Sequence, residues 1–126
     1  TPALHDVDRK DIDQVNAELL DLTRRTRAGS LKLAELTEGT ITVTSLGDQG
    51  VASVLGVIYP PQVALIGFGR VLARPWVVDG EVRVLPVVTA TLAADHRASD
   101  GHRGGLLLAA VRDLLQAPDG LVKGIR

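Results

Sequence analysis

The chain has 126 residues, 45% apolar and 23% charged, which suits one soluble domain with a sizeable core. A net charge of −1 and single Trp, Tyr and Phe residues give no reason to expect nucleic acid or an anionic membrane as partner. The lack of cysteine excludes disulfides and thiolate nucleophiles, and no apolar run approaches the roughly 18 residues of a membrane helix.

The first predicted element is an amphipathic helix over residues 9–27. Asp8 is the expected N-cap, Asp11 adds negative charge to the first turn, and Val7 and Ile12 suit a hydrophobic staple. Apolar residues then recur at three- and four-residue steps, at Ile12, Val15, Leu19 and Leu22. Ala28-Gly29 is expected to end this helix, and the opening residues do not have the pattern of a signal peptide.

Strands dominate the middle of the chain. A helical turn is predicted near residues 33–36, followed by a β-branched strand at 40–44 and an apolar strand at 63–68 that is covered on both faces. A hairpin is expected over residues 76–84 around Asp79-Gly80, because glycine accepts positive φ in a tight turn. A further strand is predicted at 87–92.

A second helix is expected near the end of the chain. Its apolar face comprises Leu106, Leu107, Ala110, Val111, Leu114 and Leu115, and Pro118 and Gly120 are expected to end it. The order of helix, several strands, loop and helix predicts an α+β domain whose helices cover one face of the strands.

The loop Asp95–Gly101 is the strongest candidate for chemistry, although a polar surface turn would have a similar composition. A metal site there lacks a convincing third ligand, since His5 and His102 do not supply one. A hydrolase triad would need Ser99 presented by a nucleophile elbow, and the sequence contains no Gly-x-Ser-x-Gly. General base catalysis by His96 remains, because imidazole titrates near neutral pH. An aspartate one turn later is expected to pair with a nearby arginine and to hold the loop in shape.

Five segments in order resemble the catalytic domain of the dihydrolipoamide acyltransferases, the core components of 2-oxo acid dehydrogenase complexes. Asp95–Gly101 matches the family hallmark Asp-His-Arg-x-x-Asp-Gly at every fixed position. Thr40–Gly47 and Pro60–Gly67 match two further segments of that domain. The stretch from Arg74-Pro75 through Asp79-Gly80 to Pro86, and Asp8-Arg9-Lys10 with the helix after it, also agree.

The resemblance implies a fold like chloramphenicol acetyltransferase, a mixed β-sheet covered by helices, present here as a partial domain. It also implies an enzyme that moves an acyl group between dihydrolipoamide and coenzyme A within a pyruvate, 2-oxoglutarate or branched-chain complex. Residues 1–126 are expected to correspond to the second half of the catalytic domain, without its first half, the lipoyl domain and the subunit-binding domain. The alternative is a non-catalytic core piece that oligomerises but does not turn over.

The resemblance also assigns roles to individual residues. It makes His96 the general base, Asp100 the aspartate that orders the site, and Thr44 the hydroxyl that stabilises the oxyanion, where the family more usually has serine. Arg97, Ser45 and Gly101 are supporting residues, with Ser45 as the fallback hydroxyl. No metal is expected at this site.

The partners implied by the family are coenzyme A and dihydrolipoamide as substrates, with lipoate carried on a separate lipoyl domain. A homotrimer or larger assembly is expected, since the family's site lies between subunits. The 2-oxo acid decarboxylase and dihydrolipoamide dehydrogenase components are the expected protein partners, and no nucleic acid or membrane is. The expected location is the bacterial cytoplasm, with the mitochondrial matrix as the other possibility.

Overall fold

The computed structural model describes residues 2–122, which divide into two compact units. The first contains the chain up to Thr40 together with the residues from Ala109 onward, and the second is Ile41–Leu108. Helix α3 (Gly101–Gln116) begins in the second unit and continues into the first. No helix among the described residues has the length and apolar character that crossing a membrane requires.

The first unit contains α1 (Ile12–Arg27), α2 (Leu33–Thr37), α4 (Asp119–Val122) and a short 3-10 helix, η1 (Val7–Arg9). The predicted N-cap at Asp8 is wrong: Asp8 lies inside η1, and Asp11 caps α1. The Asp11 carboxylate accepts a hydrogen bond from the Gln14 backbone at 2.8 Å, and the Gln14 side chain accepts one from the Asp11 backbone at 3.1 Å. This reciprocal pair satisfies two amides that the helix itself leaves free.

Among its described residues, the first unit contains two buried side chains, and one of them joins α2 to α1. Leu22 is the buried member of the apolar stripe of α1, and Glu35 of α2 is buried as well. Arg25 donates two hydrogen bonds to the Glu35 carboxylate, at 2.7 and 2.6 Å. These bonds lower the pKa of Glu35 to about 2, so the buried carboxylate stays charged and paired.

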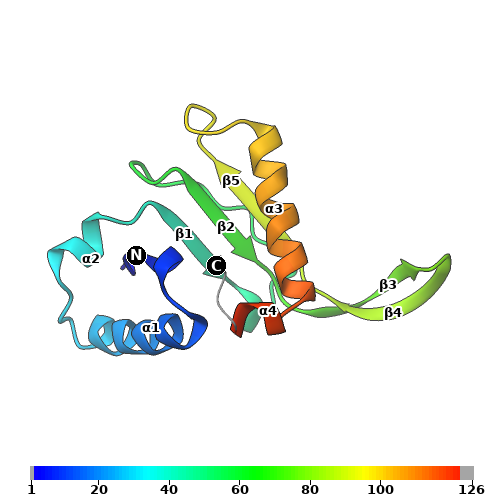
Figure 1. The fold of residues 1–126 in the computed structure, drawn as a ribbon, viewed down its shortest axis with the longest axis horizontal. Coiled ribbons are helices and arrows are strands. Elements are labelled where there is room, and N and C mark those ends of the chain that lie inside the picture. Colours follow the sequence, from blue (N-terminus) through cyan, green and yellow to red (C-terminus); the bar gives the residue numbers. More distant parts are fainter. Residues whose placement is uncertain (1, 123–126) are drawn as a thin grey trace. The chain divides into compact units, whose positions relative to one another are not determined.

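The second unit contains a three-stranded mixed sheet in the order β1-β2-β5 (Figure 1). β1 (Ile41–Ser45) runs parallel to β2 (Ala64–Phe68), and β5 (Ala90–Ala94) runs antiparallel to β2. The strands predicted at 40–44 and 63–68 are confirmed to within one residue. The strand predicted at 87–92 is displaced, because Val87 pairs with Leu72 in the neighbouring hairpin and β5 starts only at Ala90.

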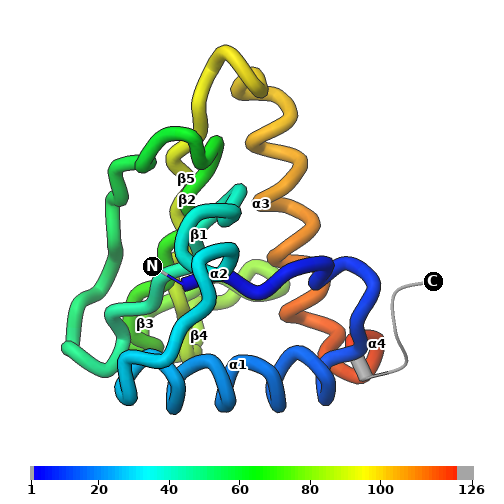
Figure 2. Tube along the Cα trace, turned by 90° about the vertical axis from the view of Figure 1, so that its left-hand side faces the viewer, coloured from blue at the N-terminus to red at the C-terminus, as the bar shows by residue number. Residues whose placement is uncertain are grey.

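Both faces of β2, the central strand, are covered, as its apolar run predicted. An extended segment, residues 51–58, lies along one face of β2 and is called the strap below; Figure 2 shows it as a separate run of chain beside the sheet. On the other face, Gly104 of α3 lies against the Leu92 side chain. Ile66, in the middle of β2, is buried.

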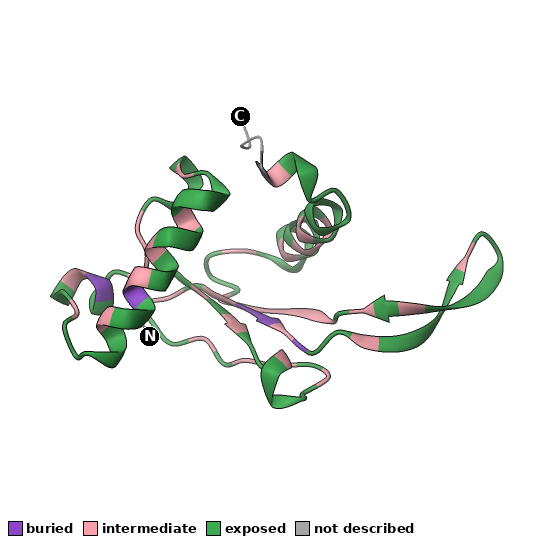
Figure 3. Ribbon diagram, turned by 90° about the horizontal axis from the view of Figure 1, so that it is seen from below, coloured by how far each residue is buried: buried purple, intermediate pink, exposed green. Residues whose placement is uncertain are grey.

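The remaining strands, β3 (Leu72–Val78) and β4 (Glu81–Val87), form a two-stranded hairpin. Its turn is the predicted Asp79-Gly80, where both residues have positive φ, 52° and 79°. The hairpin is longer than predicted, and most of its length is exposed (Figure 3). Its exposed residues include the apolar Trp76, Val77, Val82 and Val84.

Candidate functional site

The hallmark segment Asp95–Gly101 forms a tight loop between β5 and α3. The Asp95 backbone amide donates to the Val63 carbonyl at 2.8 Å, which extends the β2–β5 ladder by one residue. The chain then turns, and the Asp95 carbonyl accepts hydrogen bonds from the amides of Ala98 and Ser99 at 2.9 and 3.1 Å. His96 therefore lies directly at the end of a sheet strand, on a loop closed by its own backbone.

Asp95, the first acidic residue of the loop, forms an ion pair with Arg97. Arg97 donates to Asp95 through its backbone amide at 2.9 Å and through its guanidinium at 2.7 Å. These hydrogen bonds lower the pKa of Asp95 to about 2, and the same contact raises the pKa of Arg97. The arginine pair expected for Asp100 is therefore formed by Asp95 in the described structure.

Asp100 holds the start of α3 instead. Its carboxylate accepts a hydrogen bond from the Arg103 backbone amide at 2.9 Å, and its carbonyl accepts one from the Gly104 amide at 3.1 Å. Such a side chain satisfies an amide that the first helical turn leaves free. The helix consequently begins at Gly101, five residues before the apolar face by which it was predicted.

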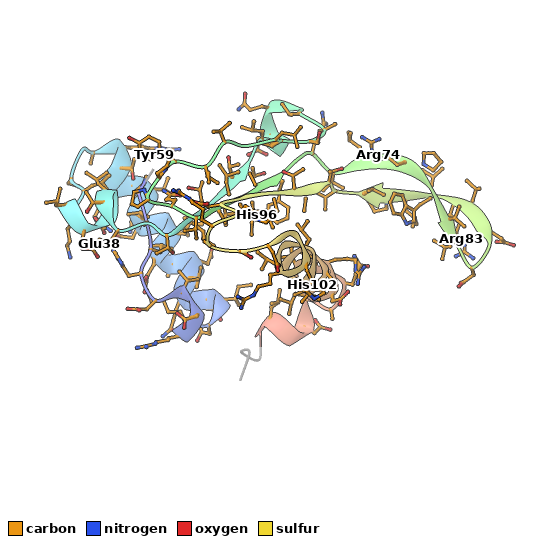
Figure 4. All side chains as sticks on the ribbon, turned by 90° about the horizontal axis from the view of Figure 1, so that it is seen from above. Glu38, Tyr59, Arg74, Arg83, His96 and His102 are labelled. Atoms are coloured by element: carbon orange, nitrogen blue, oxygen red, sulfur yellow. The ribbon has the colours of Figure 1, made fainter. Side chains whose placement is uncertain are left out.

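His96 is exposed, and its imidazole makes no hydrogen bond within residues 2–122. Figure 4 shows it on the loop after β5, at the end of the sheet away from the hairpin that carries Arg74 and Arg83. His102 lies in the first turn of α3 and is also exposed. With both flanking aspartates engaged by other groups, the His96 imidazole is presented to solvent with its ring nitrogens available.

Thr44 lies near the end of β1, on the face of the sheet that the strap covers. It is in register with Gly67 of β2, which is in register with Thr91 of β5, so these three residues form one row across the sheet. A β-carbon built on Gly67 would meet the Val54 side chain at 3.0 Å, which places the strap over this row. Ser45, the fallback hydroxyl, follows Thr44 directly and therefore points to the opposite face.

The row that contains Thr44 and the loop that contains His96 lie at opposite ends of the sheet. Asp95 is four residues beyond Thr91 on an extended ladder, a separation of about 13 Å along the strand. Two side chains that act on the same carbonyl group must approach to about 3 Å of it. Within one chain the His96 imidazole and the Thr44 hydroxyl do not meet.

The other chemistries considered for the loop have no geometric support. In residues 2–122 no three histidine or acidic side chains gather closely enough to hold a metal ion. The Ser99 hydroxyl donates to the Asp100 carbonyl at 3.5 Å, and no hydrogen bond joins it to His96 in that part of the chain. The residues that sequence reasoning missed are Val54, Gly67 and Thr91, since only strand register and the close approach of the strap reveal them.

Comparison with known proteins agrees with this architecture. Residues 1–123 match the family model described as 2-oxoacid dehydrogenases acyltransferase (catalytic domain). An uncharacterized protein of Mycobacterium tuberculosis is 53% identical over 72 residues, which cover 57% of this chain and 90% of that protein. The succinyltransferase component of the Escherichia coli 2-oxoglutarate dehydrogenase complex is 34% identical over 122 residues, which cover 97% of this chain and 30% of that protein.

A solved structure of dihydrolipoamide acetyltransferase from Azotobacter vinelandii superimposes with a TM-score of 0.85 at 25% identity, covering 96% of this chain. This chain spans 50% of that structure, so it matches about half of a solved acyltransferase core. Other relatives are named as acetyltransferase components of pyruvate dehydrogenase complexes. With a family model that covers nearly its whole length, the chain belongs to the 2-oxoacid dehydrogenase acyltransferase catalytic-domain family.

Proposed function

We propose that this chain contributes catalytic residues to an enzyme that transfers an acyl group between dihydrolipoamide and coenzyme A. The observation that carries the proposal is the placement of His96 at the end of β5, with Asp95 and Asp100 both engaged in holding the loop. The family's relatives are acyltransferase components of pyruvate and 2-oxoglutarate dehydrogenase complexes.

In this reaction the thiol of coenzyme A attacks the thioester carbonyl of the acylated dihydrolipoamide. His96 accepts the thiol proton as the carbon–sulfur bond forms. The carbonyl oxygen becomes an oxyanion, to which the Thr44 hydroxyl donates a hydrogen bond. When the tetrahedral intermediate collapses, the bond to the dihydrolipoamide sulfur breaks, and His96 returns its proton to that leaving thiolate. The products are acyl-coenzyme A and free dihydrolipoamide.

The spacing of the three proposed residues supports their roles. In the Azotobacter enzyme a serine, a histidine and an asparagine were investigated for their role in the catalytic mechanism. That histidine follows the serine by 52 positions and precedes the asparagine by four. His96 follows Thr44 by 52 positions and precedes Asp100 by four. Thr44 keeps the hydroxyl of serine, and Asp100 keeps the oxygen that accepts a hydrogen bond from the helix.

The separation of His96 from Thr44 supports a site shared between two copies of the chain. Because about 13 Å of strand lies between the two positions, one copy would supply the imidazole and a neighbour the hydroxyl. We therefore propose a homotrimer or larger assembly as the active form. The cubic core of a pyruvate dehydrogenase complex, whose chain superimposes with a TM-score of 0.81 at 27% identity, is an assembly built from related chains.

The wider context is proposed from the family. Residues 1–126 would form the second half of a catalytic domain, and the lipoate would be attached to a separate lipoyl domain. The decarboxylase and dihydrolipoamide dehydrogenase components of the complex would be the protein partners. The bacterial relatives favour a location in the bacterial cytoplasm.

Acyl exchange tests the proposal. The full-length protein containing these residues is incubated with short acyl-coenzymes A and dihydrolipoamide, and the acyl-dihydrolipoamide formed is measured by mass. We expect exchange with at least one short acyl group and its loss in His96→Ala. If the protein assembles but no acyl group exchanges, the enzymatic proposal fails and the alternative, a non-catalytic core piece that oligomerises, takes its place. The intact mass of the sample shows whether residues upstream of Thr1 belong to the expressed protein.

A further inference from the structure

The hydroxyl of Thr91 lies in the same row as Thr44 but makes a contact of a different kind. It donates a hydrogen bond to the backbone carbonyl of Val54, 37 positions earlier in the chain. Thr91 is on β5, and Val54 is in the strap that crosses the face of the sheet. This hydrogen bond therefore ties one edge strand of the sheet to the segment that covers it.

Glycines allow the strap to approach so closely. A β-carbon on Gly67 would lie 3.0 Å from the Val54 β-carbon, 3.1 Å from the Val54 carbonyl oxygen and 3.0 Å from the Thr91 hydroxyl. A β-carbon on Gly69 would overlap the backbone of Ala52. At Gly69, therefore, backbone packs directly on the backbone of the strap, and the Arg70 amide adds a hydrogen bond to the Val51 carbonyl at 2.7 Å.

This arrangement places Val54 between the two threonines. Val54 lies over Gly67, and the residues on either side of Gly67 in the row are Thr44 and Thr91, each about 4.8 Å away across the sheet. Because Gly67 has no side chain, Val54 occupies the space that a side chain at position 67 would fill. A threonine side chain has few rotamers, and a neighbouring apolar group selects among them.

We propose that Thr91 is a positioning residue, which acts through Val54 to orient the Thr44 hydroxyl. Thr91 anchors the strap by its hydrogen bond, the strap holds Val54 over Gly67, and Val54 limits the rotamers of Thr44. The inference rests on the proposed function, since it gives Thr44 a hydroxyl that must point at a reacting carbonyl. It assigns no substrate contact to Thr91.

The principal test compares Thr91→Val, which keeps the shape but removes the hydroxyl, with Thr91→Ser, which keeps the hydroxyl. Hydrogen exchange of the Arg70 amide reports whether the strap stays in place, and carbon–carbon and carbon–nitrogen couplings report the rotamer of Thr44. We expect Thr91→Val to speed exchange at Arg70 about two- to tenfold, the range for one net hydrogen bond, and to mix the Thr44 rotamers. Thr91→Ser should resemble the wild type in both measurements.

Thr42→Val is the matched control. Thr42 lies on the same strand and face as Thr44, and its hydroxyl donates to the Gln62 side chain, so its replacement also removes one threonine hydrogen bond on this face. Arg70 exchange and the Thr44 rotamer should not change in this variant. Unchanged exchange and an unchanged Thr44 rotamer in Thr91→Val would overturn the inference, whether or not the protein transfers acyl groups.

Activity separates positioning from a purely structural role. In acyl exchange Thr91→Val should lower kcat about two- to tenfold with KM unchanged. The kcat of Thr91→Ser should equal that of the wild type, because serine keeps the hydroxyl. Because Thr91 acts through Thr44, the double variant Thr44→Val/Thr91→Val should be no slower than Thr44→Val alone. Additive losses would show that Thr91 acts independently of Thr44 and would overturn the inference. A different outcome would test the proposed function itself. If Thr44→Val kept full activity while Thr91→Val displaced the strap, the proposed oxyanion role of Thr44 would be refuted.

Discussion

The His96 loop and the Thr44 row are built in different ways. Beyond the hydrogen bond from Asp95 to Val63 that joins it to the sheet, the loop is held by contacts between near neighbours in sequence: Arg97 with Asp95, and Asp100 with Arg103. The Thr44 row is held by contacts between four separate segments, since β1, the strap, β2 and β5 each contribute one residue. A local loop tolerates changes elsewhere in the fold, whereas the row depends on the whole sheet. The two halves of the proposed site should therefore fail in different ways when they are mutated.

The largest expected effect is on the loop itself. His96→Ala should lower acyl exchange about 10²–10⁴-fold, the usual contribution of a general base, and leave the fold intact because the side chain is exposed. The measurement is kcat with a short acyl-coenzyme A, accompanied by circular dichroism. His102→Ala is the control, because His102 lies outside the hallmark segment and should have little effect. Near-normal turnover in His96→Ala would refute its role, and an equal loss in His102→Ala would mean that the wrong histidine was chosen.

The next effect concerns Thr44. Thr44→Val should lower kcat about 10²–10³-fold, or roughly 3–4 kcal/mol, with little change in the binding of acyl-coenzyme A, because the oxyanion exists only in the transition state. Thr44→Ser should keep most of the activity, since the donor remains. If Thr44 served only as a β-branched strand residue, valine would be tolerated and serine would be the worse substitute. The order of these two variants therefore decides between the explanations.

The third prediction compares the free energy of unfolding of two glycine variants, one at Gly69 against the strap and one at Gly105, which has open space beside it. Gly69→Ala should destabilise the chain by about 1–3 kcal/mol, because its β-carbon would overlap the Ala52 backbone and displace the strap. Gly105→Ala is the control. Apart from the chain neighbours of Gly105 and the surrounding helix backbone, no atom of residues 2–122 lies within 4 Å of a β-carbon built there, and alanine should stabilise this interior helix position by about 0.5–1 kcal/mol. Urea denaturation of both variants measures the difference. Equal free energies of unfolding would contradict close packing of the strap at Gly69.

The smallest expected effect is the pH dependence of the stability that the Asp95–Arg97 ion pair contributes to the folded state. The pKa of Asp95, about 2, is below its ordinary value of 3.8, so its ion pair with Arg97 stabilises the folded state above about pH 4. That contribution should be lost as the pH falls from about 4 through about 2, because the carboxylate is protonated in both states only below the folded-state pKa. Asp95→Asn should remove this part of the pH dependence. Urea midpoints of the two proteins at pH 5, 3 and 2 test it, and parallel curves would contradict the assignment.

Local patterns predicted much of the fold because the interactions concerned lie within a few residues. The Asp79-Gly80 turn needs only two residues that accept positive φ, and the structure has both. The strands at 40–44 and 63–68 were marked by β-branched and apolar runs. The N-cap of α1 was misplaced because Asp8 and Asp11 are both acceptable caps, and the hydrogen bonds with Gln14 favour Asp11.

The sequence by itself thus determined the α+β class, the family and the hallmark loop with His96, since each follows from motifs of a few neighbouring residues. Only the tertiary structure decided that β5 starts at Ala90 and not at Val87, because Val87 pairs across the hairpin with Leu72. It likewise decided that Thr44 shares a row with Gly67 and Thr91 under Val54, and that the same chain holds His96 at the far end of the sheet. These relations depend on strand register and on close backbone approach, which join segments distant in sequence and leave no periodic pattern within any one of them.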